Sequence, residues 1–322
     1  YERELEVFAA HDIEYFFYNG GGDSQDTTFK VSEMAKKLKF PLKCVGIPKT
    51  VDNDLPYTDC SPGFGSVAKY IATSTLEAGL DVKSMAETST KVFILEVMGR
   101  HAGWIAAASC LAATKAGDPP HIILLPEVPF EKTKFITQVK QTVKEQGYCV
   151  IVASEGTQTK NGKFLADSGL TDAFGHKQLG GVAPVLAGMI SKIGLKNHWA
   201  VADYLQRSAR HIASKTDLDQ AYAVGEHAVK LAIAGKTALM PIIKRTSDSP
   251  YKWKIATAPL KNVANIEKTM PKKFISKNGF EISQAGKTYL SPLIKGEAPI
   301  KYVNGLPDVA ELKKVKVEKK LN

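Results

Sequence analysis

The chain has 322 residues, of which 44% are hydrophobic, and a formal net charge of +10. This length and composition can bury a sizeable core and predict two domains. The sequence has no apolar run long enough to span a bilayer and no secretion signal at its start, so we expect a cytoplasmic protein with no membrane partner. The charge favours anionic partners. Because nucleic-acid-binding motifs are absent, phosphorylated small molecules are favoured over nucleic acid.

Four cysteines, Cys44, Cys60, Cys110 and Cys149, have no spacing typical of a metal site, and we expect them to be reduced thiols.

Strand-like and helix-like segments alternate along most of the chain. Residues 13–18 predict a strand, and apolar residues at helical spacing predict a helix that begins near Ser24. The later predicted elements are a strand at 41–47, a helix from 64, a strand at 91–97, an alanine-rich helix to 113, a strand at 121–125, a helix at 132–146, a strand at 148–153, a helix at 218–234 and a strand at 238–244. This alternation predicts an α/β fold with mainly parallel sheets, in which the loops after the strands bind ligands.

The first such loop is Gly20-Gly21-Gly22-Asp23-Ser24, between a predicted strand and a predicted helix. Glycines let the backbone approach a phosphate, and a helix N-terminus offers unpaired N–H groups. A tight turn with Ser24 as a helix cap is the alternative. Because a carboxylate repels phosphate, Asp23 indicates either a bridging Mg²⁺ or the exclusion of a larger nucleotide.

The second loop follows the strand at 41–47 and contains Lys49, Thr50, Asp52 and Asp54. Two carboxylates beside an ammonium and a hydroxyl can take a proton, hold a cation and neutralise an anion. The alternative is a turn whose Asp and Asn residues cap the next helix.

Three motifs, in this order and spacing, resemble the phosphofructokinase family: Gly-Gly-x-Asp-Ser, the segment from Pro48 to Asp54, and the segment from Glu96 to Arg100. The resemblance extends from residue 1 to about residue 290 and is strongest for the pyrophosphate-dependent members. It implies two Rossmann-like three-layer α/β domains with the active site in the cleft between them. It also implies reversible phosphoryl transfer from pyrophosphate to the 1-hydroxyl of fructose 6-phosphate, which gives fructose 1,6-bisphosphate.

The resemblance divides the chain into a donor domain at 1–63, a sugar-phosphate domain at 64–206, a return to the first domain with C-terminal helices at 207–290, and a tail at 291–322. Family members carry a further strand and a Gly-Gly-containing donor loop upstream of the position of Tyr1. Either the protein has this segment before residue 1, or the donor site of residues 1–322 alone is incomplete.

Catalytic roles follow from the resemblance. Asp52 matches the general base, Thr50 would hold the transferred phosphoryl oxygens, and Lys49 and Arg100 would neutralise charge. Asp54 would orient Mg²⁺. The donor-binding residues would be Gly21, Gly22, Asp23, Ser24 and Lys49. Because Gly22 stands where family members often have Asp, the metal ligands are expected to be Asp23 and Asp54, with Asp26 as an alternative.

Sugar-phosphate contacts are also implied. The matching residues are Thr50, Asp52, Met98, Gly99, Arg100, Glu155, Tyr204 and Arg207, with Arg207 on the 6-phosphate. Glu155 could instead be a capping carboxylate. Lys91 matches a residue that reaches the 6-phosphate from a neighbouring subunit, which implies a homodimer or homotetramer; an ordinary strand-start charge is the alternative. The place of a second neighbour-subunit residue falls near His198.

Three positions indicate the donor. ATP-using relatives commonly have small residues at the positions of Asp23, Thr27 and Lys49, so these side chains favour pyrophosphate. The alternatives are an ATP-dependent phosphofructokinase and a non-catalytic sugar-phosphate-binding regulatory subunit.

Overall fold

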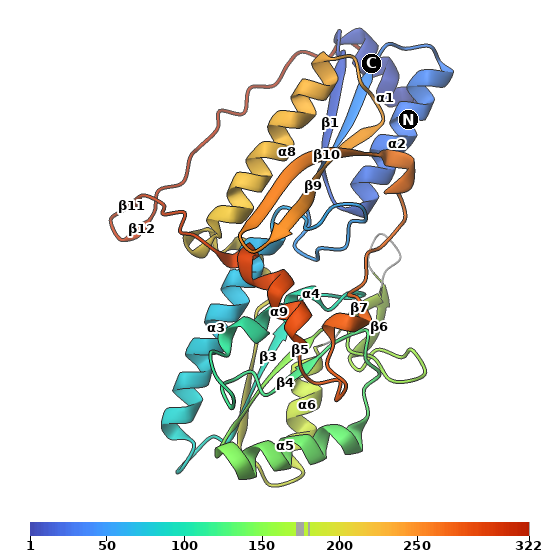
Figure 1. The fold of residues 1–322 in the computed structure, drawn as a ribbon. Coiled ribbons are helices and arrows are strands. Elements are labelled where there is room, and N and C mark those ends of the chain that lie inside the picture. Colours follow the sequence, from blue (N-terminus) through green and yellow to red (C-terminus); the bar gives the residue numbers. More distant parts are fainter. Residues whose placement is uncertain (172–176, 180, 322) are drawn as a thin grey trace.

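The structure, a computed structural model, describes residues 1–171, 177–179 and 181–321. Within this part the chain is built around two four-stranded sheets, one in each half of the molecule (Figure 1).

The upper sheet in Figure 1 has the strand order β1-β2-β9-β10. Strands β1 and β2 are parallel, β9 continues in parallel beside β2, and β10 is antiparallel to β9. Successive side chains of β2 point to opposite faces: Cys44 packs with residues of α1 and α2, whereas Val45 packs with Ala228 and Ala232 of α8. The elements of this half are α1 (Glu2–Ala10), β1 (Tyr15–Gly20), α2 (Gly22–Lys37), β2 (Lys43–Pro48), α8 (Lys215–Ile233), β9 (Leu239–Asp248) and β10 (Tyr251–Pro259).

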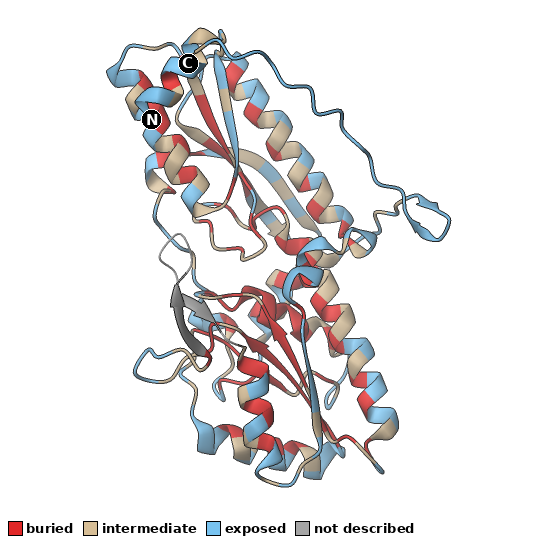
Figure 2. Cartoon of the chain, turned by 180° about the vertical axis from the view of Figure 1, so that it is seen from behind, coloured by how far each residue is buried: buried red, intermediate tan, exposed pale blue. Residues whose placement is uncertain are grey.

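The lower sheet is parallel throughout, with the order β4-β5-β3-β8. Every residue of β5 is buried, as expected for an inner strand that helices cover on both faces (Figure 2). Leu95 and Val97 pack in a cluster with α3 and α4, and Ile94 packs in a cluster with α5 and α6. The elements of this half are α3 (Phe64–Met85), β3 (Val92–Val97), α4 (Trp104–Ala108), β4 (Ile122–Leu124), α5 (Lys132–Gln146), β5 (Cys149–Ser154), α6 (Val182–Ser191) and β8 (Asn197–Val201).

Short elements complete the chain: η1 (Ser109–Ala112), β6 (Asp167–Thr171), β7 (Lys177–Leu179), α7 (Asp203–Ser208), η2 (Arg210–Ile212), η3 (Leu260–Asn262), η4 (Lys272–Phe274), α9 (Gln284–Leu290), η5 (Ser291–Ile294), β11 (Tyr302–Val303) and β12 (Leu306–Pro307). After β10 the chain does not stay with the upper sheet. Phe274 and Leu290 belong to the same hydrophobic cluster as Val97, so the C-terminal helices pack at the junction of the two halves. The division into domains at residues 63, 206 and 290 stays a prediction.

The α/β class with mainly parallel sheets is confirmed, and each predicted strand and helix has a counterpart. Several boundaries differ from the prediction: β1 ends at Gly20 rather than 18, α8 begins at Lys215 rather than 218, and β9 extends to Asp248 rather than 244. Helix α2 begins at Gly22 rather than near Ser24, and the alanine-rich helix is a short α4 followed by the 3₁₀ turn η1. Residues 301–320 are exposed, and this extended segment returns along α8 toward the N-terminus (Figure 1). None of the described helices combines the length and the apolar character needed to cross a membrane.

Candidate active site

The two loops that the sequence predicted to bind phosphate lie side by side at the carboxyl ends of β1 and β2. Gly20 pairs with Pro48 at the end of these strands, and the Lys49 N–H donates a hydrogen bond of 3.1 Å to the Gly20 carbonyl. A cavity of about 630 Å³ opens beside them. Its lining comes from both halves of the molecule: Gly21, Gly22, Asp23, Thr50, Asp52, Asp54, Leu55, Arg100, His101, Ala102, Glu155, Asn265, Ile266 and Glu267.

A buried glutamine holds the two loops together. The Gln25 side-chain amide donates to the carbonyls of Gly20, at 2.9 Å, and Ile47, at 3.1 Å. Gly46 makes room for it, because a Cβ there would lie 1.9 Å from Gln25 Oε1. The sequence reasoning missed Gln25, since a single polar residue on a predicted helix resembles a surface position. Its nearness to the glycine loop was the only available signal.

The glycine loop forms the N-terminus of α2. Gly21 is the N-cap, so Ser24 stands inside the first turn rather than at the cap. Gly20 is required for this close packing, because a Cβ there would lie 2.0 Å from Ser24 Oγ. Backbone N–H groups in a first helical turn have no partner within the helix and attract anions. Gly21, Gly22 and Asp23 line the cavity at this end of α2, whereas Ser24 does not.

Asp52 is the most perturbed carboxylate facing the cavity. Burial raises its pKa to about 7, and the nearby charges of Asp54 and Glu155 act in the same direction. The cations of Arg100 and Lys49 oppose this rise. The Asp52 N–H donates to Thr50 Oγ1 at 3.1 Å, which fixes the turn. A carboxylate whose pKa lies near neutrality is suited to accept a proton.

Asp54 offers a free oxygen ligand at the same cavity. Its Oδ1 is buried and has no hydrogen-bond partner among the described residues. Burial raises the pKa of this carboxyl. Asp26 is engaged elsewhere, with Lys30 at 2.5 Å and Asn265 at 3.0 Å.

Hard oxygen ligands of this kind fit Mg²⁺, which keeps several waters and is commonly held by one or two carboxylates plus substrate phosphates. Within residues 1–171, 177–179 and 181–321, no three metal-binding side chains form a preassembled cluster. Asp23 and Asp54 together would therefore fit a metal that arrives with its phosphate ligand.

The end of β3 supplies the opposite wall. Gly99 has φ = +133°, and a Cβ there would lie 2.6 Å from the Ala102 carbonyl, so only glycine fits. Its N–H donates to Glu155 Oε1 at 3.2 Å. Glu155 lies in the turn after β5 and faces the cavity, which differs from a helix-capping carboxylate. Burial raises the pKa of Glu155, and Arg100 opposes this. The Met98 N–H donates to Gln206 at 3.4 Å, and Met98 does not line the cavity.

Lys49 and Arg207 line a second cavity, of about 300 Å³, on the other side of the same loop. Arg210 adds a further cation there. The Arg207 guanidinium lies 4.1 Å from the centre of the Tyr204 ring, and Tyr204 is exposed. Asp52, Asp54, Arg100 and Glu155 thus line the larger cavity together. Arg207 lines the smaller cavity instead, and Tyr204 packs against its guanidinium.

Lys91 lies far from both cavities. It directly precedes β3, whereas Met98 directly follows β3, and the intervening residues of an extended strand span about 20 Å. The Lys91 ammonium also donates to the Ala86 carbonyl. His198 pairs with Phe93 in the neighbouring strand. Neither residue can serve the cavity of its own chain, so the role assigned to them requires a neighbouring subunit and stays a prediction.

The family profile described as Phosphofructokinase matches residues 1–232. The pyrophosphate–fructose 6-phosphate 1-phosphotransferase of Halomonas elongata is 64% identical over 322 residues, covering 100% of this chain and 77% of that protein. The enzyme of the same name from Methylococcus capsulatus is 59% identical, with the same coverage. The crystal structure of a pyrophosphate-dependent phosphofructokinase from Marinobacter aquaeolei superposes with a TM-score of 0.92 at 60% identity, covering 100% of this chain and 78% of that one. The chain belongs to the phosphofructokinase family.

Proposed function

We propose that this protein is a pyrophosphate-dependent phosphofructokinase, which transfers a phosphoryl group from pyrophosphate to the 1-hydroxyl of fructose 6-phosphate. The observation that carries the proposal is Asp52, a carboxylate with a pKa of about 7 that faces a cavity shared with the N-terminus of α2 and with Arg100. Matches that cover 100% of this chain and 77% of enzymes named for this reaction support it.

In the forward reaction, Asp52 accepts the proton of the sugar 1-hydroxyl as that oxygen forms a bond to the donor phosphorus. The bridging P–O bond of pyrophosphate breaks, and inorganic phosphate leaves. Thr50 and the N–H groups at the start of α2 hold the phosphoryl oxygens, while Arg100 and Lys49 neutralise charge. In the reverse direction the protonated Asp52 returns its proton to the sugar oxygen.

Asp23 and Asp54 are the residues that would hold Mg²⁺. When bound, the ion supplies positive charge that neutralises the phosphate oxygens. It also explains why a carboxylate at Asp23 can stand at a phosphate-binding helix N-terminus.

On the sugar side, Glu155 accepts hydrogen bonds from sugar hydroxyls, and the Gly99 N–H, next to Met98, holds the Glu155 carboxylate in place. Arg207 with Tyr204 reaches the 6-phosphate. Arg207 and Lys49 occupy neighbouring positions around the smaller cavity. Bidentate geometry suits an Arg to a phosphate dianion.

The donor is pyrophosphate rather than ATP because charged or bulky side chains stand where a nucleotide would need space. Asp23 projects from the first turn of α2, and Thr27 follows one turn later on the same helix. Lys49 adds a cation that compensates for the missing adenosine contacts.

The decisive experiment measures fructose 1,6-bisphosphate formation from fructose 6-phosphate and Mg²⁺ with either pyrophosphate or ATP. We expect turnover with pyrophosphate, and also phosphate-driven breakdown of fructose 1,6-bisphosphate. Asp52→Asn should lower kcat by about 10²–10⁴-fold and leave the KM for the sugar phosphate nearly unchanged. Turnover with ATP alone, or wild-type kcat in Asp52→Asn, would contradict the proposal. Sugar-phosphate binding without turnover with either donor would indicate a regulatory subunit.

The functional unit is a homodimer or homotetramer in the cytosol. Strand β8 is the free edge of the lower sheet, and it exposes Trp199 and Val201, with Tyr204 and Leu205 just beyond it. Lys91 and His198 border the same edge. A second copy covering this edge would carry its own Lys91 toward the sugar phosphate. A reducing compartment is supported by the four cysteines, which are buried free thiols.

A further inference from the structure

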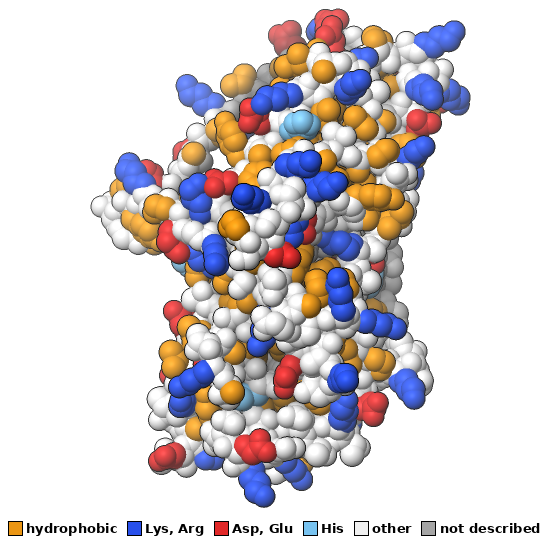
Figure 3. Space-filling view, in the orientation of Figure 1, with side chains coloured by type: hydrophobic (Ala, Val, Ile, Leu, Met, Phe, Trp, Pro, Cys, Tyr) orange, Lys and Arg blue, Asp and Glu red, His pale blue; other side chains and the backbone are white. Residues whose placement is uncertain are grey.

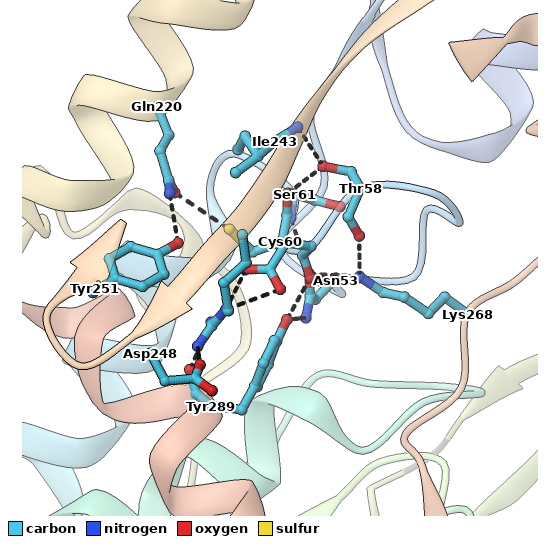
Figure 4. Close-up of polar contacts among 12 residues, drawn as sticks. Asn53, Thr58, Cys60, Ser61, Gln220, Ile243, Asp248, Tyr251, Lys268 and Tyr289 are labelled. Carbon is cyan, nitrogen blue, oxygen red and sulfur yellow. Dashed lines mark hydrogen bonds and ion pairs between the residues drawn. The ribbon is translucent and has the colours of Figure 1, made fainter. Parts of the chain in front are cut away.

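A half-buried lysine, Lys268, hydrogen-bonds to the segment that follows Asp52 (Figure 4). The Lys268 ammonium donates to Asn53 Oδ1 at 3.3 Å and to the carbonyls of Thr58 and Asp59, both at 3.0 Å. An ammonium has three hydrogens, so these contacts use its full donor capacity. All three acceptors belong to the stretch that begins immediately after Asp52.

The backbone of Lys268 contacts the same loop and also anchors it to the other half of the molecule. The Lys268 N–H donates to the Asp54 carbonyl at 2.6 Å. The Lys268 carbonyl accepts a 3.0 Å hydrogen bond from the Trp104 indole, and the ammonium lies 5.4 Å from the centre of that ring. Trp104 begins α4 in the lower half, so Lys268 connects the loop of the upper sheet to the lower core.

Asn53 needs this support because its backbone is left-handed, with φ = +55°. It is completely buried between the two carboxylates Asp52 and Asp54. Its Oδ1 also accepts from the Ser61 N–H at 2.9 Å, and its Nδ2 donates to the Tyr289 hydroxyl at 3.1 Å. The left-handed residue lies between two carboxylates that both face the cavity, so a change in its conformation would redirect at least one of them.

Tyr289 and Arg245 close the network on its far side. The Tyr289 hydroxyl donates to the Asp59 carbonyl at 2.5 Å. Arg245 Nε donates to both Asp59 carboxylate oxygens, at 3.1 and 3.0 Å, and its NH2 group donates to the Tyr289 carbonyl at 2.9 Å. Both ends of the loop are thereby tied to residues distant in the sequence.

We propose that Lys268 is a positioning residue for phosphoryl transfer, which holds the turn at Asn53 so that Asp52 and Asp54 face the cavity together. The role rests on the proposed function for the identity of the reaction. A neutral apolar side chain could fill the same volume without the cost of burying a charge. Three oxygen acceptors surround the Lys268 ammonium instead, so the network holds a cation where stability alone does not require one.

Lys268→Met tests the proposal, with the exposed Lys261→Met as the matched control. In Lys268→Met we expect kcat with pyrophosphate to fall about 10²-fold, because small displacements of reacting groups cost this much, while the KM for fructose 6-phosphate stays within about threefold of wild type. Amide hydrogen exchange of residues 50–61 should become faster in Lys268→Met and not in Lys261→Met. Wild-type kcat in a folded Lys268→Met protein, or unchanged exchange of residues 50–61, overturns the proposal.

Tyr289→Phe gives a second, milder perturbation of the same turn, and it decides the outcome if Lys268→Met does not fold. Because both side chains bond to Asn53, the loss of kcat in the double variant should be smaller than the product of the two single losses. The proposal is contradicted if the loss of kcat in the double variant equals the product of the two single losses, or if Tyr289→Phe has wild-type kcat. Absence of pyrophosphate turnover in the wild-type protein together with the upstream donor segment of the family would instead refute the proposed function, and the exchange rates of residues 50–61 would still decide whether Lys268 holds the loop.

Discussion

At the scale of single residues, Asp52, the proposed general base, lowers the stability of the fold at neutral pH. Its folded-state pKa of about 7 exceeds its ordinary value of 3.8, so the folded protein binds more protons than the unfolded chain between about pH 4 and pH 7. The free energy of unfolding therefore decreases as pH rises through this range, and the full cost is present above pH 7.

Asp52→Asn should remove this cost. We expect the variant to be more stable than wild type at pH 8 by on the order of 2 kcal/mol, since each pKa unit corresponds to about 1.4 kcal/mol and the cavity is partly solvated. The difference should vanish below about pH 4. Urea unfolding at both pH values measures it, and equal stability at pH 8 would contradict the assigned environment of Asp52.

The same carboxylate predicts the pH dependence of activity. Because only the ionised form accepts a proton, kcat/KM in the forward direction should fall on the acid side with an apparent pKa near 7. A pH profile of kcat/KM with pyrophosphate, at saturating Mg²⁺, tests this. A rate that stays constant down to pH 5 would assign the proton to another group.

Sequence reasoning predicted charged residues that the structure brings to one cavity, but it did not predict the residues that hold their loops in place. Asp52, Asp54 and Arg100 could be predicted because charged side chains follow buried strands in a family-specific order. Gln25 and Lys268 could not, because their partners are backbone carbonyls far apart in the chain. Such contacts depend on tertiary packing and leave no local pattern.

At the scale of elements, α3 links the two halves, and a side chain from α8 supports its start. Asp217 accepts hydrogen bonds from the N–H groups of Gly63, at 2.9 Å, and Ser66, at 3.0 Å, and from the Ser66 hydroxyl at 2.5 Å. The carboxylate is buried beside the positive end of the helix.

Asp217→Ala should therefore destabilise the protein by about 2 kcal/mol, because it leaves buried donors unpaired. Asp219→Ala on the same helix is the control: its pair with Lys215 is exposed and should contribute about 0–0.5 kcal/mol. Urea midpoints of both variants measure the difference. Equal effects would show that Asp217 does not cap α3.

The elements themselves were largely predictable, and the exceptions have physical reasons. β8 carries a mixed sequence because it is an exposed edge strand, so it lacks the continuous apolar run of β5. β10 pairs antiparallel at the other sheet's edge and alternates Lys with aromatic residues. The alanine-rich segment divides into two parts in the buried core. Its first part is helix α4, and its second part is the 3₁₀ turn η1, so α4 is shorter than predicted.

At the scale of the whole molecule, the net charge of +10 does not form one patch on the face that Figure 3 shows. Figure 3 shows Lys and Arg side chains dispersed over both halves of the visible face. Selectivity for a small anion must then come from local geometry, such as the cavity between the two halves. Exposed hydrophobic side chains also lie on the surface, and Trp199 and Val201 are at the free edge of β8.

That edge is where we expect a second copy to bind. An uncovered edge strand presents unpaired backbone groups, and Trp199 and Val201 are 48% and 41% exposed on it. Trp199→Glu should place a charge in the buried interface and shift the protein toward monomers in sedimentation velocity. Activity should fall with it, because Lys91 would no longer reach a neighbour's sugar phosphate. Leu38→Glu, at a 50% exposed position in the upper half, should leave both unchanged. A wild-type monomer, or an unaltered sedimentation coefficient in Trp199→Glu, would place any interface elsewhere.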